Sequence, residues 1–572
     1  MRGAGFLVRV AAVQFEPTLF RKAENTAALL RLAAEAAERV STPLQPGPAG
    51  LVVLPEMATT GYTYQTREEI APFVEPVPGP TTRVFARLAR DKRVALVVGF
   101  PEVDSETNLY YNSAVLIGPD GELAGVYRKT HSFYWDTRWA ADGDLGLPVF
   151  SGEWPGPLGM LICMDAGFFE PARVMVLNGA KVIAFPANWL RTAPSPEWRA
   201  RAAENGVYLV AANRWGEERG ARFAGGSSVI GPRGEVLAEV ARGDGVAVAE
   251  IELGEPDEPS GPDDSSRPAD RPGPEGYRGW VRRRPDLYHS LLRHPYRWPE
   301  RYNFGTLGSG RFWLGALSGT GPGLSPAALN NVARRLPGEP GRRILVLPHL
   351  ANASTRDRAG LIQAAKSSGA YFAAWLGRGE GKGEVLLLGP DGPRGRYRSP
   401  HRAAASGDGR EAPAGQPFPV FDLPFARVGL LEPLDLLLPE STRLMAIGGA
   451  DVVLASGPWP ADLDDFAFLW RERAETNDIW LALSTGKSAG VLVMPSQSEA
   501  GVNQPEEVVF GEPGQCVPGP REDGAGLRFR VTGLWAETAP GTFSRRKDRV
   551  RRLRPELYKP LVGPHGAGRR YT

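Results

Sequence analysis

Cysteine is almost absent from this sequence. Only Cys163 and Cys516 occur among 572 residues, so a framework of disulfide bonds does not organise the fold. A single bridge between the two stays open on the sequence alone. Each cysteine is otherwise either a small buried hydrophobe or a reactive thiol, and we expect Cys516 to be inert.

Long apolar runs are missing as well. No stretch of about 18 apolar residues occurs, which argues against a membrane-spanning helix. The apolar residues 6–13 are interrupted by Arg9, a pattern that predicts a buried strand rather than a signal peptide. We therefore expect a cytoplasmic protein without a membrane partner.

Net charge and metal-ligand patterns are also weak. A formal charge of +2 gives no overall attraction to nucleic acid. The six histidines form no metal-binding pattern, and no convincing glycine-rich phosphate loop occurs. We expect no nucleic-acid partner, no metal and no cofactor. A hydrophobic fraction of 42% is typical of a globular protein with a sizeable core.

The first half of the chain alternates strand-like and helix-like segments. Short apolar runs predict strands, and an apolar stripe at Leu29, Ala33, Ala36 and Val40 predicts an amphipathic helix. The expected strands are 7–14, 51–55, 94–99, 112–117, 123–127, 158–162 and 181–186, and the expected helices are 21–40, 81–91 and 168–178. This alternation favours a layered α/β fold in which helices cover a mixed sheet.

The second half of the chain repeats motifs of the first. The segment RPDLY at 284–288 returns as RPELY at 554–558, 270 positions later. Several further matches follow in the same order and indicate two copies of one domain. The predicted division is residues 1–292, a linker at 293–307, and residues 308–572. Residues 254–276, rich in proline and acidic residues, predict a further loop or linker.

Three chemically active side chains follow predicted strands of the first copy. They are Glu56 in Leu-Pro-Glu, Lys129 in Tyr-Arg-Lys, and Cys163 in Ile-Cys-Met-Asp. Open α/β sheets bind ligands at the carboxyl ends of their strands. A base, a cation and a thiol at such ends predict a site for nucleophilic catalysis.

These motifs, in this order and spacing, resemble those of the nitrilase, or carbon–nitrogen hydrolase, superfamily. The resemblance covers about residues 6–292 and, in degraded form, 311–560. The flanking matches are Gly61-Tyr62, Asn112-Ser113, Gly159, Asp165, Phe169-Glu170, Arg173, Gly179-Ala180, Pro186 and Trp189. The resemblance implies an α/β fold of two αββα sandwich domains, with the second packed on the first as a built-in pseudo-dimer partner. Assembly into a homo-oligomer is a further expectation.

The resemblance also implies roles for individual residues. Cys163 would be the nucleophile, opening a helix whose amides favour the thiolate. Glu56 would be the general base, and Lys129 with the backbone N–H of Met164 would stabilise the oxyanion. Asp136 stands where many family members carry a second glutamate, so its role as a second acid is open. Asp165 is expected to cap the helix after the nucleophile.

Other residues near the motifs have less defined roles. Tyr62, Phe133, Asn188 and Trp189 are expected to bind substrate, by position only. The aromatic run 133–135 is equally consistent with a core cluster. A dyad of Cys163 with His131 is disfavoured, because Lys129 already supplies the positive charge.

The second copy lacks the three chemically active side chains. Glu56 corresponds to His349, Lys129 to Ser399 and Cys163 to Pro433, which predicts a catalytically inactive domain.

The predicted function is hydrolysis of a carbon–nitrogen bond in a small amide or N-carbamoyl compound, through a thioester on the cysteine. Cys-Met-Asp resembles the amidase branches. The alternatives are a nitrilase with the same triad and a scaffold protein without activity.

Overall fold

The computed structural model describes residues 6–41, 49–253, 283–293, 310–319, 326–377, 383–401, 417–459, 467–485, 489–492, 529–538 and 552–562. They divide into two compact units. The division differs from the predicted domain boundary at both ends. Residues 283–292 belong to the second unit, and residues 554–562 belong to the first. Cys516, the segment 254–276 and most of the linker 293–307 lie outside the described residues.

The first sheet of the first unit contains the strands predicted before residue 128. Its order is β14-β1-β2-β3-β4-β5. The bounds are β1 Phe6–Gln14, β2 Leu51–Val53, β3 Ala95–Val103, β4 Tyr110–Ile117, β5 Leu123–Arg128 and β14 Gly245–Leu253. β1, β2 and β3 run parallel, whereas β4 and β5 add as antiparallel strands. The carboxyl ends of β1, β2, β3 and β5 therefore lie at one edge of the sheet.

A second sheet follows in the chain, where the sequence pattern indicated only two strands. Its order is β13-β12-β9-β8-β7-β6. The bounds are β6 Val149–Phe150, β7 Leu158–Met160, β8 Val182–Ala187, β9 Tyr208–Asn213, β12 Ser227–Ile230 and β13 Val236–Val240. β7, β8 and β9 are parallel. A separate hairpin joins β10 Trp215–Glu218 to β11 Ala221–Ala224. The predicted mixed α/β class is confirmed, with two sheets.

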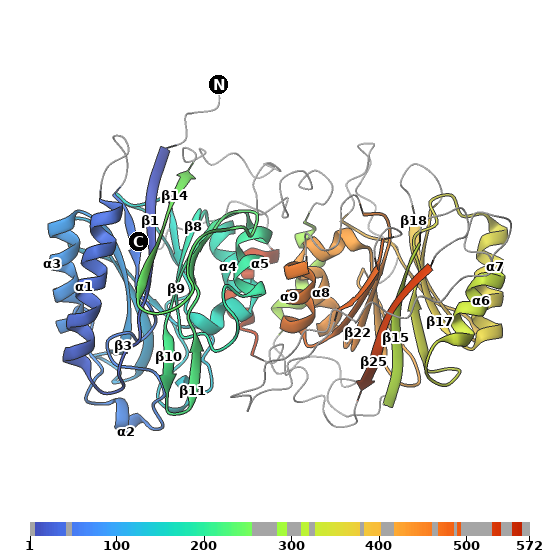
Figure 1. Cartoon of the computed structure of the whole chain (residues 1–572), viewed down its shortest axis with the longest axis horizontal. Helices are drawn as coiled ribbons and strands as arrows, with labels where there is room; N and C mark the ends of the chain where they lie inside the picture. Colours follow the sequence, from blue (N-terminus) through green and yellow to red (C-terminus); the bar gives the residue numbers. More distant parts are fainter. Residues whose placement is uncertain are drawn as a thin grey trace. The chain divides into compact units, whose positions relative to one another are not determined.

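Helices cover the outer faces of the two sheets, as Figure 1 shows. α1 (Lys22–Val40) and α3 (Pro80–Lys92) pack on the first sheet, and α4 (Phe169–Leu177) and α5 (Pro196–Asn205) on the second. The predicted stripe of α1 is confirmed, since Leu29, Ala33, Ala36 and Val40 are all buried. They join one hydrophobic core with the apolar side chains of β1, β2 and β3. The first unit is thus layered helix, sheet, sheet, helix.

The second unit has sheets with the same succession of parallel and antiparallel pairs. One sheet is ordered β25-β15-β16-β17-β18-β19, the other β20-β21-β22-β23-β24. The bounds are β15 Gly310–Gly319, β16 Arg343–Val346, β17 Tyr371–Gly377, β18 Gly383–Gly389, β19 Gly392–Tyr397, β20 Val420–Asp422, β21 Arg427–Leu431, β22 Val452–Ser456, β23 Trp480–Ser484, β24 Ala489–Leu492 and β25 Phe529–Thr538. β15 pairs parallel with β16 and antiparallel with β25, as β1 does with β2 and β14.

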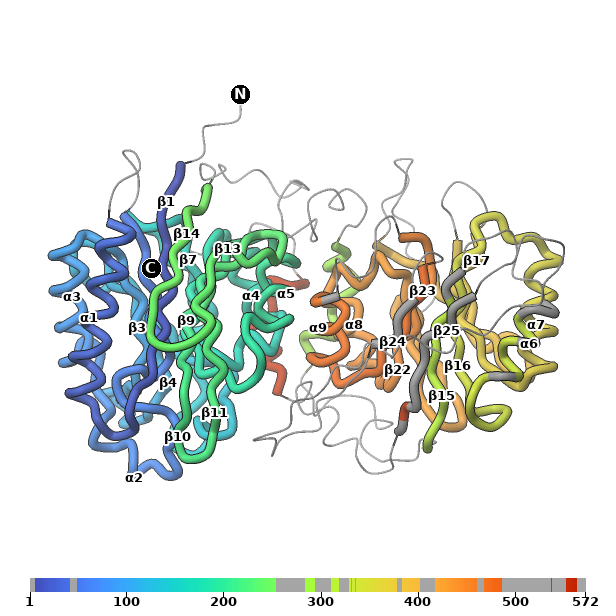
Figure 2. The backbone as a smooth tube through the Cα atoms, in the orientation of Figure 1, coloured from blue at the N-terminus to red at the C-terminus, as the bar shows by residue number. Residues whose placement is uncertain are grey.

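Helices also flank the sheets of the second unit, and the backbone tube of Figure 2 traces them. They are α6 Pro326–Arg335, α7 Thr355–Ser368, α8 Pro439–Ile447 and α9 Ala467–Asn477. Among the described residues of either unit, we find no helix with the length and apolar character needed to cross a membrane.

Truncating the core face of α1 tests the role of the predicted stripe. Leu29 is fully buried in the core, whereas Arg31, two positions along the same helix, is exposed. We expect Leu29→Ala to lower the free energy of unfolding by about 2–5 kcal/mol, because it removes buried methyl groups and leaves a cavity. Arg31→Ala should change it by less than about 0.5 kcal/mol. Chemical denaturation of both variants measures this, and equal effects would contradict the packing described.

Candidate active site

The three side chains of the predicted triad come from both sheets of the first unit. Glu56 follows β2, Lys129 follows β5 and Cys163 follows β7. β2 and β5 belong to the first sheet and β7 to the second. β2 contacts β8 and β9, and β3 contacts β8, across the interface between the sheets, and Cys163 interacts electrostatically with both Glu56 and Lys129.

A buried ionic cluster forms the base of the site. Lys129 Nζ donates to Glu56 Oε1 and to Asp136 Oδ2, each over 2.7 Å. All three side chains are almost inaccessible to solvent, at 1% or less. Asn112 Nδ2 contacts both carboxylates, at 2.7 Å from Glu56 Oε1 and 3.0 Å from Asp136 Oδ1. One cation and one amide therefore hold two carboxylates side by side.

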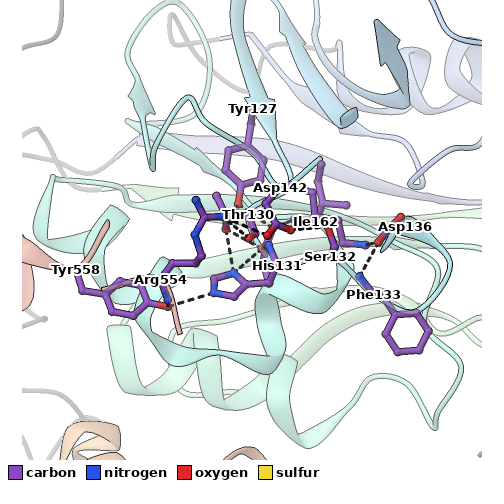
Figure 3. A network of polar contacts seen from close by, with 12 residues as sticks. Tyr127, Thr130, His131, Ser132, Phe133, Asp136, Asp142, Ile162, Arg554 and Tyr558 are labelled. Atoms are coloured by element: carbon purple, nitrogen blue, oxygen red, sulfur yellow. Dashed lines mark hydrogen bonds and ion pairs between the residues drawn. The ribbon is translucent and has the colours of Figure 1, made fainter. Parts of the chain in front are cut away.

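Asp136 also connects this ionic cluster to two neighbouring aromatic residues. It opens the short helix η1 (Asp136–Arg138). The Tyr62 hydroxyl donates to Asp136 Oδ2 over 3.2 Å. The Phe133 backbone N–H donates to the same oxygen over 2.8 Å (Figure 3). The Tyr62 ring lies 5.6 Å from Lys129 Nζ, within range of a cation–π contact. Asp136 therefore belongs to the cluster despite being one carbon shorter than glutamate.

Glu56 retains one carboxylate oxygen for chemistry. Its Oε1 accepts from Lys129 and Asn112, whereas its buried Oε2 has no hydrogen-bond partner among the described residues. Burial raises the pKa of Glu56 and the nearby charge of Asp136 adds to this, while Lys129 opposes it. A carboxylate with a raised pKa and a free oxygen is suited to accept a proton from a thiol.

Lys129 is held as a cation by its neighbours. Burial alone would lower its pKa, but the charges of Asp136 and Glu56 outweigh burial, and the pKa of Lys129 lies well above its usual value. An ammonium group has three N–H donors. Two are used by Glu56 and Asp136, so one remains for a substrate oxygen.

Cys163 occupies a strained backbone position. Its φ is +44°, a left-handed conformation that residues with a side chain rarely adopt. It opens the short 3₁₀ helix η2 (Cys163–Gly167), and α4 begins only at Phe169. The predicted helix over 168–178 is confirmed, but it does not begin at Cys163.

The surroundings of Cys163 oppose the thiolate that helix amides were expected to favour. Burial raises the pKa of the Cys163 thiol, and the charge of Glu56 raises it further. Lys129 and the backbone of Asn188 lower the pKa, but they do not compensate. A thiol with a raised pKa needs a nearby base to form the thiolate, the form of cysteine that acts as a nucleophile.

Asp165 does more than cap a helix. Its carboxylate accepts from the backbone N–H of Ile162, the residue directly before the nucleophile, over 2.9 Å. It also accepts from the Tyr127 hydroxyl at 2.8 Å, the Thr130 hydroxyl at 2.9 Å and the His131 backbone at 3.0 Å. Burial opposes ionisation of Asp165, yet hydrogen bonds from His131, Ile162 and Tyr127 hold its pKa below the usual value.

The predicted substrate-binding residues are placed differently from one another. Asn188 follows β8 and is buried, and its side-chain Nδ2 and Oδ1 lack hydrogen-bond partners among the described residues. Trp189 is buried and packs edge-to-face on Trp198 at 5.6 Å. Tyr62 and Phe133 belong to an aromatic cluster beside the ionic group. Met164 lies in η2 directly after Cys163.

Sequence reasoning missed two features of the site. Asn112 appeared only as a motif flank, yet it bridges Glu56 and Asp136; its position as a buried amide on β4 was the available signal. The pairing of His131 with Tyr558 over 3.1 Å had no sequence signal beyond the repeated RPELY motif. Among the described residues, no group of three or more His, Cys, Asp or Glu is arranged to hold a metal ion.

In the second unit, the matching positions make other contacts. His349 Nδ1 lies 3.0 Å from the backbone oxygen of Thr485. The Ser399 hydroxyl donates to Asp435. Pro433 opens the short helix η7 (Pro433–Leu437), at the place that Cys163 has in η2.

The first half of the chain is similar in sequence to known proteins. The family model described as carbon-nitrogen hydrolase matches residues 9–257. A nitrilase from Pyrococcus abyssi is 41% identical over 249 residues, which cover 43% of this chain and 90% of that protein. An N-carbamoylputrescine amidase from Oryza sativa is 32% identical over 320 residues, covering 51% of this chain and 96% of that protein.

A solved structure is also similar. It is an amidase of the nitrilase superfamily from Nesterenkonia AN1, with 27% sequence identity and a TM-score of 0.38; the match covers 43% of this chain and 91% of that one.

Replacing Glu56 tests the charge balance of the cluster. Two buried carboxylates share one cation, and burial raises the pKa of Glu56. A carboxyl group with a raised folded pKa destabilises the protein above that pKa, because its ionised form is disfavoured in the fold. We therefore expect Glu56→Gln to raise the free energy of unfolding by about 1–3 kcal/mol at pH 8.

The same argument fixes the pH dependence and the control. The gain should be absent below about pH 4.5, the ordinary pKa of a glutamate carboxyl, grow from there up to the raised pKa of Glu56, and stay constant above it. Glu35→Gln on the exposed face of α1 should show no such gain. Denaturation curves between about pH 4 and pH 9 measure both variants; a Glu56→Gln variant less stable than the wild type at pH 8 would contradict the argument.

Proposed function

Because the chain belongs to the carbon–nitrogen hydrolase family, we propose that its first unit hydrolyses the carbon–nitrogen bond of a small amide or N-carbamoyl compound through a thioester on Cys163. The products are ammonia or an amine and an acid. The observation that carries the proposal is the unpartnered Oε2 of Glu56 in a cluster whose Lys129 keeps one donor unused. Such an arrangement supplies a base and an oxyanion donor together.

The first half of the reaction forms the thioester. Glu56 Oε2 accepts the proton of the Cys163 thiol, and the sulfur attacks the carbonyl carbon of the amide. The carbonyl oxygen becomes an oxyanion, which the third N–H of Lys129 and the backbone N–H of Met164 stabilise. Protonated Glu56 then gives its proton to the leaving nitrogen, and the carbon–nitrogen bond breaks.

The second half returns the enzyme to its starting state. Glu56, again ionised, accepts a proton from water while the water oxygen attacks the thioester carbon. The tetrahedral intermediate collapses, the carbon–sulfur bond breaks, and the proton on Glu56 returns to Cys163. The acid leaves and one water has been consumed.

Asp136 serves as a positioning residue in this scheme. Asp136 accepts from Lys129 and from the backbone N–H of Phe133, and so holds the cation beside this aromatic residue. Its shorter side chain reaches Lys129 at 2.7 Å, the same distance as Glu56. Asp136 therefore acts on the substrate through Lys129.

Substrate recognition falls to the polar and aromatic residues beside the triad. A buried amide side chain without partners is costly unless a ligand satisfies it. Asn188 is such a group, and its backbone already interacts with Cys163. We assign it to hydrogen bonding with the substrate amide, with Tyr62, Phe133 and Trp189 forming the apolar surroundings.

Nitriles are the second candidate substrate class. The relative from Pyrococcus abyssi is named a nitrilase, and the same thiol can attack a nitrile carbon. A panel of aliphatic amides, N-carbamoyl compounds and nitriles, assayed for ammonia release, separates the two classes. Turnover of nitriles alone would favour the nitrilase alternative.

The second unit is proposed to be an inactive copy of the first. The equivalent order of strand pairing supports this. Pro433 stands at the place of Cys163. Because its ring fixes φ at about −65°, it cannot adopt the left-handed conformation of Cys163. His349 and Ser399 supply neither a carboxylate nor an ammonium group. Packing of the two copies as a pseudo-dimer stays a prediction.

Acylation of the nucleophile is the direct test. We expect mass spectrometry after exposure to an amide panel to show an acyl adduct on the peptide with Cys163 and none on the peptide with Cys516, the other cysteine of the chain. Cys163→Ala should show neither adduct nor ammonia release. An active enzyme that forms no adduct, or a modified Cys516, would contradict the mechanism.

Removing the cation should impair both catalysis and folding. We expect Lys129→Ala to lower kcat by on the order of 10²–10³-fold, the usual cost of a lost oxyanion donor. Two buried carboxylates then lack their cation, which costs about 3–5 kcal/mol of unfolding free energy. Lys92→Ala is the matched control, because Lys92 also pairs with a glutamate at 2.8 Å but at the surface; it should change neither kcat nor stability by a measurable amount. Steady-state kinetics and denaturation measure both variants.

A further inference from the structure

A segment from the far end of the chain packs against the first unit. It comprises the short helix η9 (Pro555–Leu557) and the helix α12 (Lys559–Val562), and α12 contacts α4, which follows the nucleophile loop. The guanidinium of Arg554 donates to the backbone oxygen of Thr130 over 3.0 Å. Arg554 and Tyr558 thus contact the turn after Lys129, although they follow it in the sequence by more than 400 positions (Figure 3).

Tyr558 of the same segment contacts a buried histidine of the first unit. Its side chain is fully buried, and its hydroxyl lies 3.1 Å from His131 Nε2. The same hydroxyl oxygen accepts from the Arg554 backbone N–H over 3.1 Å.

His131 transmits this contact to the nucleophile loop. Its Nδ1 lies 3.0 Å from Asp165 Oδ1. An ionised carboxylate only accepts, so Nδ1 carries the hydrogen and Nε2 is left to accept from Tyr558. Stacking on Phe168, with ring centroids 4.0 Å apart, fixes the ring plane. Asp165 in turn bonds the N–H of Ile162 and so closes the turn that contains Cys163.

We propose that Tyr558 is a positioning residue for the nucleophile, acting through His131 and Asp165 on the turn that contains Cys163. The inference rests on the proposed function of Cys163. By this route, a segment that follows the second copy in sequence completes the support of the active site in the first. The strained φ of +44° at Cys163 needs such support, because a left-handed residue persists only where its surroundings fix it.

The second unit contains the same contacts beside Pro433, whose side chain cannot act as a nucleophile. Tyr288 lies 3.0 Å from His401 Nε2, and His401 Nδ1 lies 2.9 Å from Asp435 Oδ1. Asp435 accepts from the N–H of Glu432 over 2.9 Å, directly before Pro433. Loss of one hydroxyl at Tyr288 or at Tyr558 should therefore have a similar effect on packing, while only Tyr558 acts on a nucleophile.

The test compares Tyr558→Phe with Tyr288→Phe in the full chain. We expect Tyr558→Phe to slow single-turnover acylation of Cys163 by about fivefold, the effect of one buried hydrogen bond, with KM unchanged. Tyr288→Phe should leave acylation at the wild-type rate. Both variants should shift the thermal unfolding midpoint by similar small amounts. Slowing in both variants or in neither, or a change in KM alone, would overturn the proposal.

Two further measurements separate this inference from the proposed function. Alkylation of Cys163 by iodoacetamide needs no substrate, and we expect it to slow in Tyr558→Phe but not in Tyr288→Phe. An unchanged or faster rate would overturn the positioning role even if no amide is ever turned over. If Tyr558 acts through His131, adding Tyr558→Phe to His131→Ala should cause no further loss; additive losses would also overturn it.

Discussion

Lys129 lies buried between two carboxylates, and the rest of the active site depends on this arrangement. A lysine without paired charges would not remain ionised in an apolar interior. Glu56 and Asp136, each 2.7 Å away, keep it a cation. The cluster carries one carboxylate more than it has cations, and the excess falls on Glu56, whose second oxygen has no partner among the described residues. The cluster therefore holds an unfavourable negative charge, and in the proposed mechanism this charge is the base.

The position of Cys163 depends on a second buried carboxylate. Asp165 accepts from three side chains and two backbone amides, among them the amide directly before the nucleophile. It ties the hairpin end that carries Lys129 to the turn that carries the thiol. One network thus sets the separation between cation and nucleophile, although they come from different sheets.

The sequence predicted those features that depend on local pattern. The apolar stripe of α1 was recognisable because its buried residues repeat with the period of a helix. The strands before Glu56 and Cys163 were recognisable as short apolar runs. The strands β12 and β13 were not, because each has only four or five residues. β9 carries an apolar run of the same kind and was not among the predicted strands. The partners of Asn112 and the pair His131–Tyr558 could not be derived, because a local pattern does not show which distant side chain a residue contacts. The roles of Glu56, Lys129 and Cys163 came from a resemblance that the geometry supports.

The contacts kept by the second unit separate structural from chemical requirements. Tyr397, His401 and Asp435 repeat the bonds of Tyr127, His131 and Asp165, including the link to a tyrosine of the RPDLY type. Glu56, Lys129 and Cys163 have no such counterparts. A set of bonds retained where no nucleophile exists must at least hold the fold together, so its presence alone is no evidence of a catalytic role. The same hydrogen bonds also position a nucleophile only where the turn that they close contains a strained, reactive residue. For this reason the comparison between Tyr558 and Tyr288 isolates what the network contributes to chemistry from what it contributes to packing.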